Sequence, residues 1–182
     1  MPIFGRRCKQ LVKYDGISLD LSGLGLTGGE SIKFELGQLN VKRKLMQVAS
    51  EIAQLLDAVQ YSNCVKIEQT PKDSPERVKL IYQAMESERQ LVQLTLLTKL
   101  IMAQPNSEHL QKALAEWVAS LAVRTQELSV QVQRTTMRRR MRLPTSATIN
   151  SSLERAKKDE PRLAEAIQKK ASFNMEKVLT AL

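Results

Sequence analysis

The chain has 182 residues, 42% of them hydrophobic and 4% aromatic, and its formal net charge is +9. This length suits one compact domain with an appendage, and an aliphatic core favours helices over a β-sandwich rich in aromatic side chains. The composition excludes a membrane-spanning helix, because no apolar run reaches the roughly 18 residues that a span requires. Two distant cysteines and the lack of a signal peptide pattern indicate a reduced, cytoplasmic setting.

Residues 1–37 show an alternation of apolar and polar side chains that predicts β-strands. Two alternating segments, 17–22 and 31–36, flank the glycine-rich loop 23–29, so we expect a β-hairpin. The loop approaches the glycine spacing of a dinucleotide-binding turn, but such a turn must open a helix, and here a second strand follows. We therefore expect no cofactor. Because a lone hairpin is marginal in water, it must pack on helices or pair with another chain.

From residue 40 onward the apolar side chains recur at steps of three and four, which predicts helices. The first helix is expected over residues 41–67. Ser74 should cap a second helix that begins at Pro75 and ends near Gln104. The residues expected on one apolar side of this second helix are Val78, Ile81, Met85, Val92 and Leu96. Its later half carries a second apolar row, which predicts a central position in a bundle.

A third helix is expected to start after Ser107 and to continue without interruption through Val132 into the arginine-rich residues 134–142. Pro144 should end this helix, because proline cannot continue the backbone hydrogen-bond pattern. Residues 145–152 are then expected to form a polar linker.

Together these elements predict a mainly α protein. The N-terminal β-hairpin occupies residues 1–37, an antiparallel three-helix bundle occupies residues 38–133, and a basic helical C-terminal tail occupies residues 134–182. This tail consists of a basic linker and a C-terminal helix that is split at Pro161. The turns between the helices are short, which favours antiparallel neighbours.

Reactive side chains that could converge on a catalytic centre are scarce. His109 is the only histidine, and its place in the first turn of the third helix favours a solvent-facing side chain. Cys64 follows an apolar string and is expected to be a buried thiol. A nucleophile–base pair would require Cys64 and His109 to meet across helices. We expect no catalytic site, no metal site and no enzymatic activity.

Positive charge is concentrated toward the C-terminus. Residues 1–123 carry 15 basic and 13 acidic side chains, whereas residues 124–182 carry 13 basic and 6 acidic ones. Three of the arginines are spaced by four, so on a helix they would form one ridge, and guanidinium groups bind carboxylate or phosphate at two points. The residues expected to bind an acidic partner or nucleic acid are Arg134, Arg138, Arg139, Arg140, Arg142, Lys157 and Lys158.

Several partners suit this basic segment, in which Met137 and Met141 interleave with the arginines. An acidic protein surface is the first, and nucleic acid bound through its phosphates is the second. Phe173 is the only aromatic residue after Trp117, which disfavours single-strand binding by base stacking. An anionic membrane surface is the third. Self-association of the chain is a further alternative. The last alternative is a solvated basic tail without a dedicated ligand.

Trp117, the only tryptophan, lies on the apolar stripe of the third helix. A core anchor is the default interpretation of such a residue. The alternative is an anchor at a protein interface, where tryptophan is enriched among the residues that carry most of the binding energy.

Two groups of residues between Leu55 and Val118 carry a further pattern. They are Leu56-Asp57, Gln60-Tyr61, Cys64 and Lys66-Ile67, followed by Asn106-Ser107-Glu108, Leu110-Gln111, Ala113-Leu114 and Trp117. The stretch resembles helical adaptor-like modules of bacterial conflict and signalling proteins. The resemblance implies homotypic assembly or partner recruitment and carries over no catalytic residue. The expected function is a non-catalytic adaptor or scaffold that assembles a larger, bacterial complex, with the basic tail docking on an acidic surface.

Overall fold

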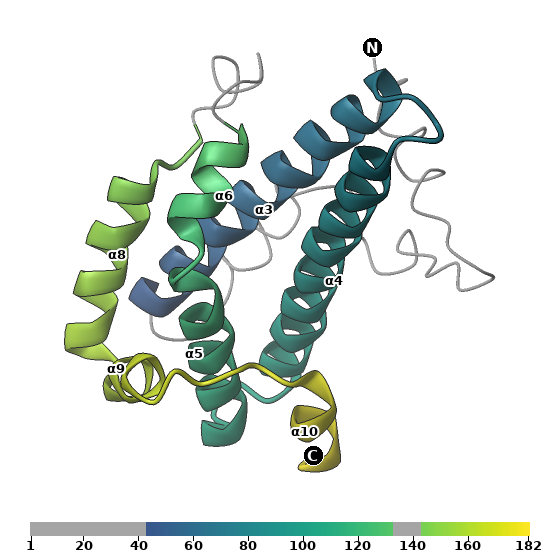
Figure 1. The fold of residues 1–182 in the computed structure, drawn as a ribbon. Helices are drawn as coiled ribbons and strands as arrows, with labels where there is room; N and C mark the ends of the chain where they lie inside the picture. The colour runs from purple at the N-terminus through teal and green to yellow at the C-terminus, as the bar shows by residue number, and fades with distance from the viewer. Residues whose placement is uncertain (1–42, 133–142) are drawn as a thin grey trace.

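A computed structural model of the chain describes residues 43–132 and 143–182. The helices in these residues are α3 (Arg43–Gln69), α4 (Pro75–Ala103), α5 (Glu108–Ala122), α6 (Thr125–Val132), α8 (Ser146–Asp159), α9 (Pro161–Gln168) and α10 (Met175–Thr180) (Figure 1). This part of the chain contains seven helices and no strand, so the mainly α class is confirmed. The predicted β-hairpin and both predicted borders, at 37/38 and 133/134, lie outside the described residues.

The turn between α3 and α4 is held by side chains that satisfy the helix ends. The hydroxyl of Ser74 accepts a hydrogen bond from the Glu76 N–H at 3.2 Å, and Pro75 occupies the first position of α4. Arg77 donates from Nη1 to the carbonyl oxygens of Thr70, at 2.8 Å, and Ile67. The predicted cap is confirmed, and both helices end within two residues of their predicted ends.

The prediction of one continuous third helix is wrong, because the helix breaks after Ala122 and resumes at Thr125. At the break, the Thr125 hydroxyl donates to the Ala122 carbonyl at 3.0 Å, and the Arg124 N–H donates to the Leu121 carbonyl at 2.9 Å. Such local bonds compete with the regular helical pattern. The break redirects the chain, so that α6 packs against α3.

The prediction of a polar linker over residues 145–152 is also wrong. Helix α8 begins at Ser146, and Thr145 is its N-cap, with its hydroxyl accepting from the Thr148 N–H at 3.1 Å. Its apolar stripe is short and is set among polar residues, but all of its members are buried: Ile149, Leu153 and Ala156. The predicted break at Pro161 is confirmed, since α8 ends at Asp159 and α9 starts at Pro161.

A polar network joins α8 to α3. The Ser152 hydroxyl donates to Oε1 of Glu51 at 3.0 Å and accepts from Nη2 of Arg155 at 3.2 Å. Lys44 near the start of α3 pairs with Asp159 at the end of α8. These hydrogen bonds and this ion pair fix the orientation of α8 on α3, where the apolar contact area is small.

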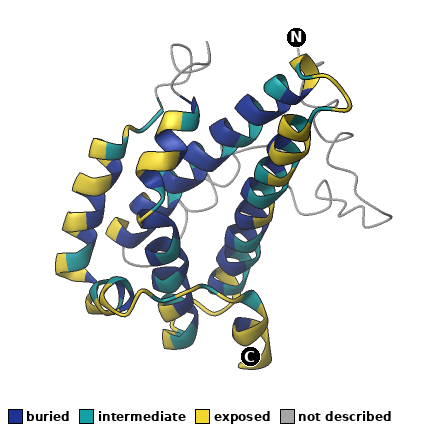
Figure 2. Cartoon of the chain, in the orientation of Figure 1, coloured by how far each residue is buried: buried dark blue, intermediate teal, exposed yellow. Residues whose placement is uncertain are grey.

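The main hydrophobic core runs from Leu45 in α3 to Val178 in α10, and a small second cluster of Ile67, Leu80 and Ala84 joins α3 to α4. Helix α3 is central, since it packs against α4, α5, α6 and α8, while α9 packs on α5. Figure 2 shows the buried faces turned inward, with the exposed faces of α6, α8 and α10 outside. The C-terminal helices are therefore part of the packed body.

Candidate functional site

The predicted arginine cluster, Arg134, Arg138, Arg139, Arg140 and Arg142, lies outside the described residues. Described residues on both sides of this cluster pack against the core. Val132 at the end of α6 is buried, and Leu143 packs against the core. The end of α6 and the start of α8 lie at the same end of the molecule (Figure 1). The described residues next to the gap, Val132 and Leu143, are therefore both anchored in the core.

The end of α6 is tied to α3 by two hydrogen bonds. The carbonyl oxygen of Gln131 accepts from the Ser62 hydroxyl and from the Lys66 ammonium group, both at 3.4 Å. A lysine at the C-terminal end of a helix also interacts favourably with the helix dipole. These contacts fix the end of α6, the last described helix before the arginine-rich residues.

Three of the seven cations in residues 143–182 have carboxylate partners among the described residues: Lys157, Arg162 and Lys169. Lys157, one of the predicted docking residues, pairs with Glu154 at 2.5 Å, and Arg162 pairs with Glu108 at 3.0 Å. Lys158 is exposed and forms no ion pair with a described residue. Residues 143–182 carry seven basic and five acidic side chains, whereas residues 134–142 carry five arginines and no acidic residue. The excess charge is therefore concentrated in the arginine-rich residues rather than spread over the tail.

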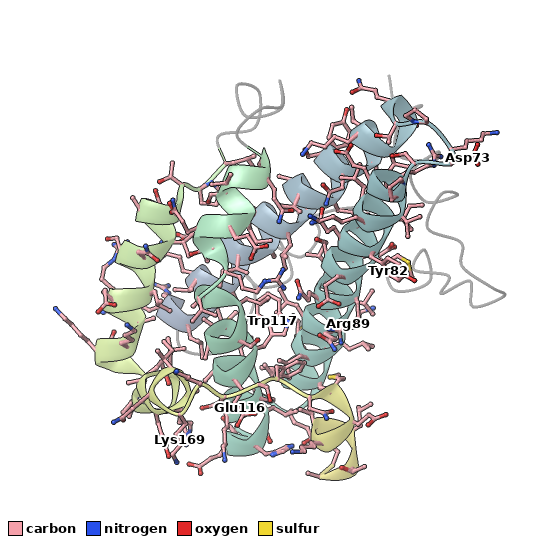
Figure 3. The ribbon with its side chains drawn as sticks, viewed as in Figure 1. Asp73, Tyr82, Arg89, Glu116, Trp117 and Lys169 are labelled. Atoms are coloured by element: carbon pink, nitrogen blue, oxygen red, sulfur yellow. The ribbon has the colours of Figure 1, made fainter. Side chains whose placement is uncertain are left out.

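Trp117 is buried, with 1% of its surface exposed, and it is the largest fully buried side chain among the described residues. Figure 3 shows it on α5 in the interior between helices. Its Nε1 is buried without a hydrogen-bond partner. The structure supports the core-anchor interpretation of Trp117, since a side chain this buried offers no surface to a partner.

His109 differs from the solvent-facing residue that the sequence predicts. Its side chain is partly buried, and Nε2 lies 3.3 Å from the carbonyl oxygen of Val178, so the ring nitrogen donates to α10. Cys64 is fully buried, as predicted. Cys64 lies near the end of α3 and His109 at the start of α5, which are at opposite ends of the long helix α4 (Figure 1). The structure does not assemble these two residues into a nucleophile–base pair.

A groove between α4 and α6 was not found by reasoning from the sequence. Its volume is about 550 Å³, within the range of ligand and peptide sites. It is lined by Pro75, Val78, Lys79, Tyr82, Gln83, Glu86, Ser87, Arg124, Leu128 and Gln131. Val78, which was predicted to lie on one apolar side of the second helix, is 51% exposed, and Tyr82 is 57% exposed. The available signal was the spacing of four between these two residues, which places both on one face of α4.

The charges at one end of the groove form a connected group. Arg89 donates to both carboxylate oxygens of Glu86, at 2.7 and 2.9 Å, and Gln90 donates to Oε1 at 2.7 Å. Figure 3 labels Arg89 on α4. The hydrogen bond from Arg89 holds the pKa of Glu86 below its usual range, partial burial opposes this shift, and the charges of Arg89 and Arg124 reinforce it.

This lowered pKa predicts a pH-dependent contribution to stability. A carboxyl whose folded pKa is depressed stabilises the protein above its unfolded pKa and loses that contribution as pH falls through the folded pKa. We expect Glu86→Gln to lower the free energy of unfolding at pH 7 by at most about 1 kcal/mol, the ceiling for exposed pairs. The difference from wild type should shrink below about pH 4, the region where carboxyl groups titrate. Urea unfolding of both proteins at several pH values measures this difference in the free energy of unfolding.

The matched control for this prediction is Glu68→Gln, at an exposed carboxylate that forms no ion pair with a described residue. It should show little difference from wild type at any pH. An equal loss of stability in Glu86→Gln at pH 7 and at pH 3 would contradict the assignment of the effect to the ionised carboxylate.

Within residues 43–132 and 143–182, no helix has both the length and the apolar composition to cross a membrane. No group of three or more histidine, cysteine, aspartate or glutamate side chains in these residues could hold a metal ion.

Comparison with known proteins adds no relative: no family model, no curated protein and no solved structure matches this chain. The resemblance to adaptor-like modules between Leu55 and Val118 therefore remains a hypothesis.

Proposed function

We propose that this protein is a non-catalytic helical adaptor that assembles a larger complex, and that its arginine-rich residues 134–142 dock on an acidic surface of a partner protein. The observation that carries the proposal is the uneven distribution of charge. Five arginines occur without an acidic neighbour in these residues, while neighbouring cations such as Lys157 and Arg162 are paired with carboxylates.

The way the body holds the two flanks supports docking by a short, held segment rather than by a long pendant tail. Gln131 is bonded to α3, Val132 is buried, and Thr145 caps α8 within a few residues of the last arginine. A segment held at both ends loses less conformational entropy on binding than a free tail does, because its accessible states are already restricted.

The composition of the segment favours a protein over nucleic acid as the partner. Met137 and Met141 interleave with the arginines, which suits a surface that offers both carboxylates and apolar contacts. Arginine binds carboxylate through two parallel hydrogen bonds. Duplex nucleic acid would use the charges alone, and an anionic membrane would use the methionines as apolar anchors.

The test uses the full chain as bait in a cell extract, with and without nuclease. A truncation at residue 133 is unsuitable, because it would remove the core residues Ile149, Leu163 and Val178. We expect a stoichiometric complex that survives nuclease. We expect the triple variant Arg138→Glu, Arg139→Glu and Arg140→Glu to recover at least about tenfold less partner, since it reverses charges at the docking surface.

The matched control reverses three exposed lysines elsewhere, Lys72→Glu, Lys170→Glu and Lys177→Glu, which changes the net charge equally. This control should retain the partner. Retention of the partner by the arginine variant would show that the arginines do not dock. Loss of all bound material on nuclease treatment, with binding to generic duplex that weakens steeply with salt, would replace the proposal with nucleic-acid binding. Co-flotation with anionic vesicles that is lost in Met137→Ser, Met141→Ser would replace it with membrane binding.

A further inference from the structure

The groove between α4 and α6 has an exposed apolar centre. Val78 and Tyr82 are 51% and 57% exposed on α4, and Leu128 closes the floor from α6. Two exposed apolar side chains one turn apart on α4, beside a buried leucine of α6, are typical of a surface that another protein covers.

The two ends of the groove differ in charge. Because α4 and α6 contribute residues in opposite order, one end lies at the start of α4 and the end of α6, beside Lys79 and Gln131. Lys79 is exposed and forms no ion pair with a described residue. The other end is lined by Glu86 and Arg124, and their ion-pair partners Arg89 and Glu127 lie beside it.

The carboxylate of Glu127 is available to a further cation. It is 60% exposed, and its only ion pair with a described residue is a contact of 3.7 Å with Arg124, beyond hydrogen-bond distance. Glu86, by contrast, is already bonded to Arg89 and Gln90. Among the described residues, the groove therefore has a cation without an ion-pair partner at one end and, beside its other end, a weakly paired carboxylate.

We propose that a second copy of this chain docks on this groove, about a two-fold axis that passes near Tyr82. A two-fold axis exchanges the two ends of the groove, so that Lys79 of each copy faces Glu127 of the other. The same axis brings the two exposed apolar centres together, as an isologous interface requires. Aromatic side chains at the middle of such an interface carry a large share of the binding energy.

Charge complementarity favours a second copy over a strongly acidic or strongly basic partner. Lys79, Glu86, Arg89, Arg124 and Glu127 place three positive and two negative charges at or beside the groove, so both signs are present. A partner of one sign would meet like charge at one end, which costs binding energy. The groove is lined by none of the arginines of residues 134–142, so different variants test self-association and partner docking.

The test is the molar mass of the full chain as a function of concentration, by sedimentation equilibrium. We expect the mass to rise from 20.5 kDa toward twice that value. Tyr82→Lys should weaken the dimer at least about tenfold, because it places a charge at the apolar centre. Lys79→Glu should also weaken it, and adding Glu127→Lys to that variant should restore the affinity to within about threefold of wild type by re-forming the pair with reversed signs.

The control is Leu179→Lys, at an exposed apolar residue on α10, which should leave dimerisation unchanged. Circular dichroism of each variant confirms that the fold is retained. A wild-type chain that stays monomeric into the high micromolar range overturns the proposal. A dimer unaffected by Tyr82→Lys and Lys79→Glu also overturns it, as does a failure of the charge-reversed double variant to regain affinity.

Discussion

Replacing Trp117 with alanine is expected to lower the free energy of unfolding by about 3–5 kcal/mol, the usual cost of removing a fully buried aromatic side chain. Trp117 is 1% exposed and belongs to the core that joins the helices of the bundle. The free energy of unfolding of a small domain is only about 5–15 kcal/mol, so this loss would be a large fraction of it. Urea unfolding followed by circular dichroism measures the change.

Trp117→Phe is the informative companion variant. The indole Nε1 is buried without a hydrogen-bond partner, so phenylalanine removes an unsatisfied donor while it keeps most of the apolar volume. We expect less than half of the destabilisation that alanine causes. Val123→Ala, at a side chain that is 77% exposed, is the control and should change stability little. A phenylalanine variant as unstable as the alanine variant would show that the indole N–H has a structural partner.

Leu163→Ala is expected to destabilise the whole described bundle by about 2–5 kcal/mol. Leu163 is fully buried on α9, which packs against α5. Because one core includes residues of both α5 and α9, removal of this side chain should lower the midpoint of a single cooperative transition. A C-terminal tail that folded by itself would instead unfold separately and leave the main transition unchanged.

Two probes distinguish these outcomes. Far-ultraviolet circular dichroism reports all helices, and the fluorescence of Trp117, the only tryptophan, reports the environment of α5. We expect both probes to shift together in Leu163→Ala. Leu182→Ala, at a half-exposed residue near the C-terminus, should leave both unchanged. A fluorescence transition that keeps its wild-type midpoint while part of the dichroism signal is lost earlier would exclude a single cooperative unit.

The helix starts at Ser74 and Ser107 could be predicted because their causes are local. In each case a serine hydroxyl accepts a backbone N–H two or three residues later, and in one case proline follows at the first helical position. Interactions this short are visible in the sequence. The burial of Cys64 and of the later half of α4 also follows from patterns that repeat along one helix.

Helix α8 could not be predicted in the same way. Its segment is rich in serine, threonine and asparagine, and its stripe contains one isoleucine, one leucine and one alanine. Local composition of this kind favours turns and caps. The helix forms because α3 offers a surface that buries this stripe and supplies Glu51 to bond Ser152, and that surface is assembled from residues distant in the sequence.

The sequence by itself determined that this protein is mainly helical, where the helices capped by Ser74 and Ser107 begin, and that its unbalanced charge lies at residues 134–142. Only the tertiary structure decided which apolar residues are covered. Val78 shares the helical spacing of α4 residues that are buried, yet it is half exposed because no described helix packs over the groove that it lines beside α6. Periodicity shows which side chains share a face, whereas the covering of that face depends on where other helices break and turn.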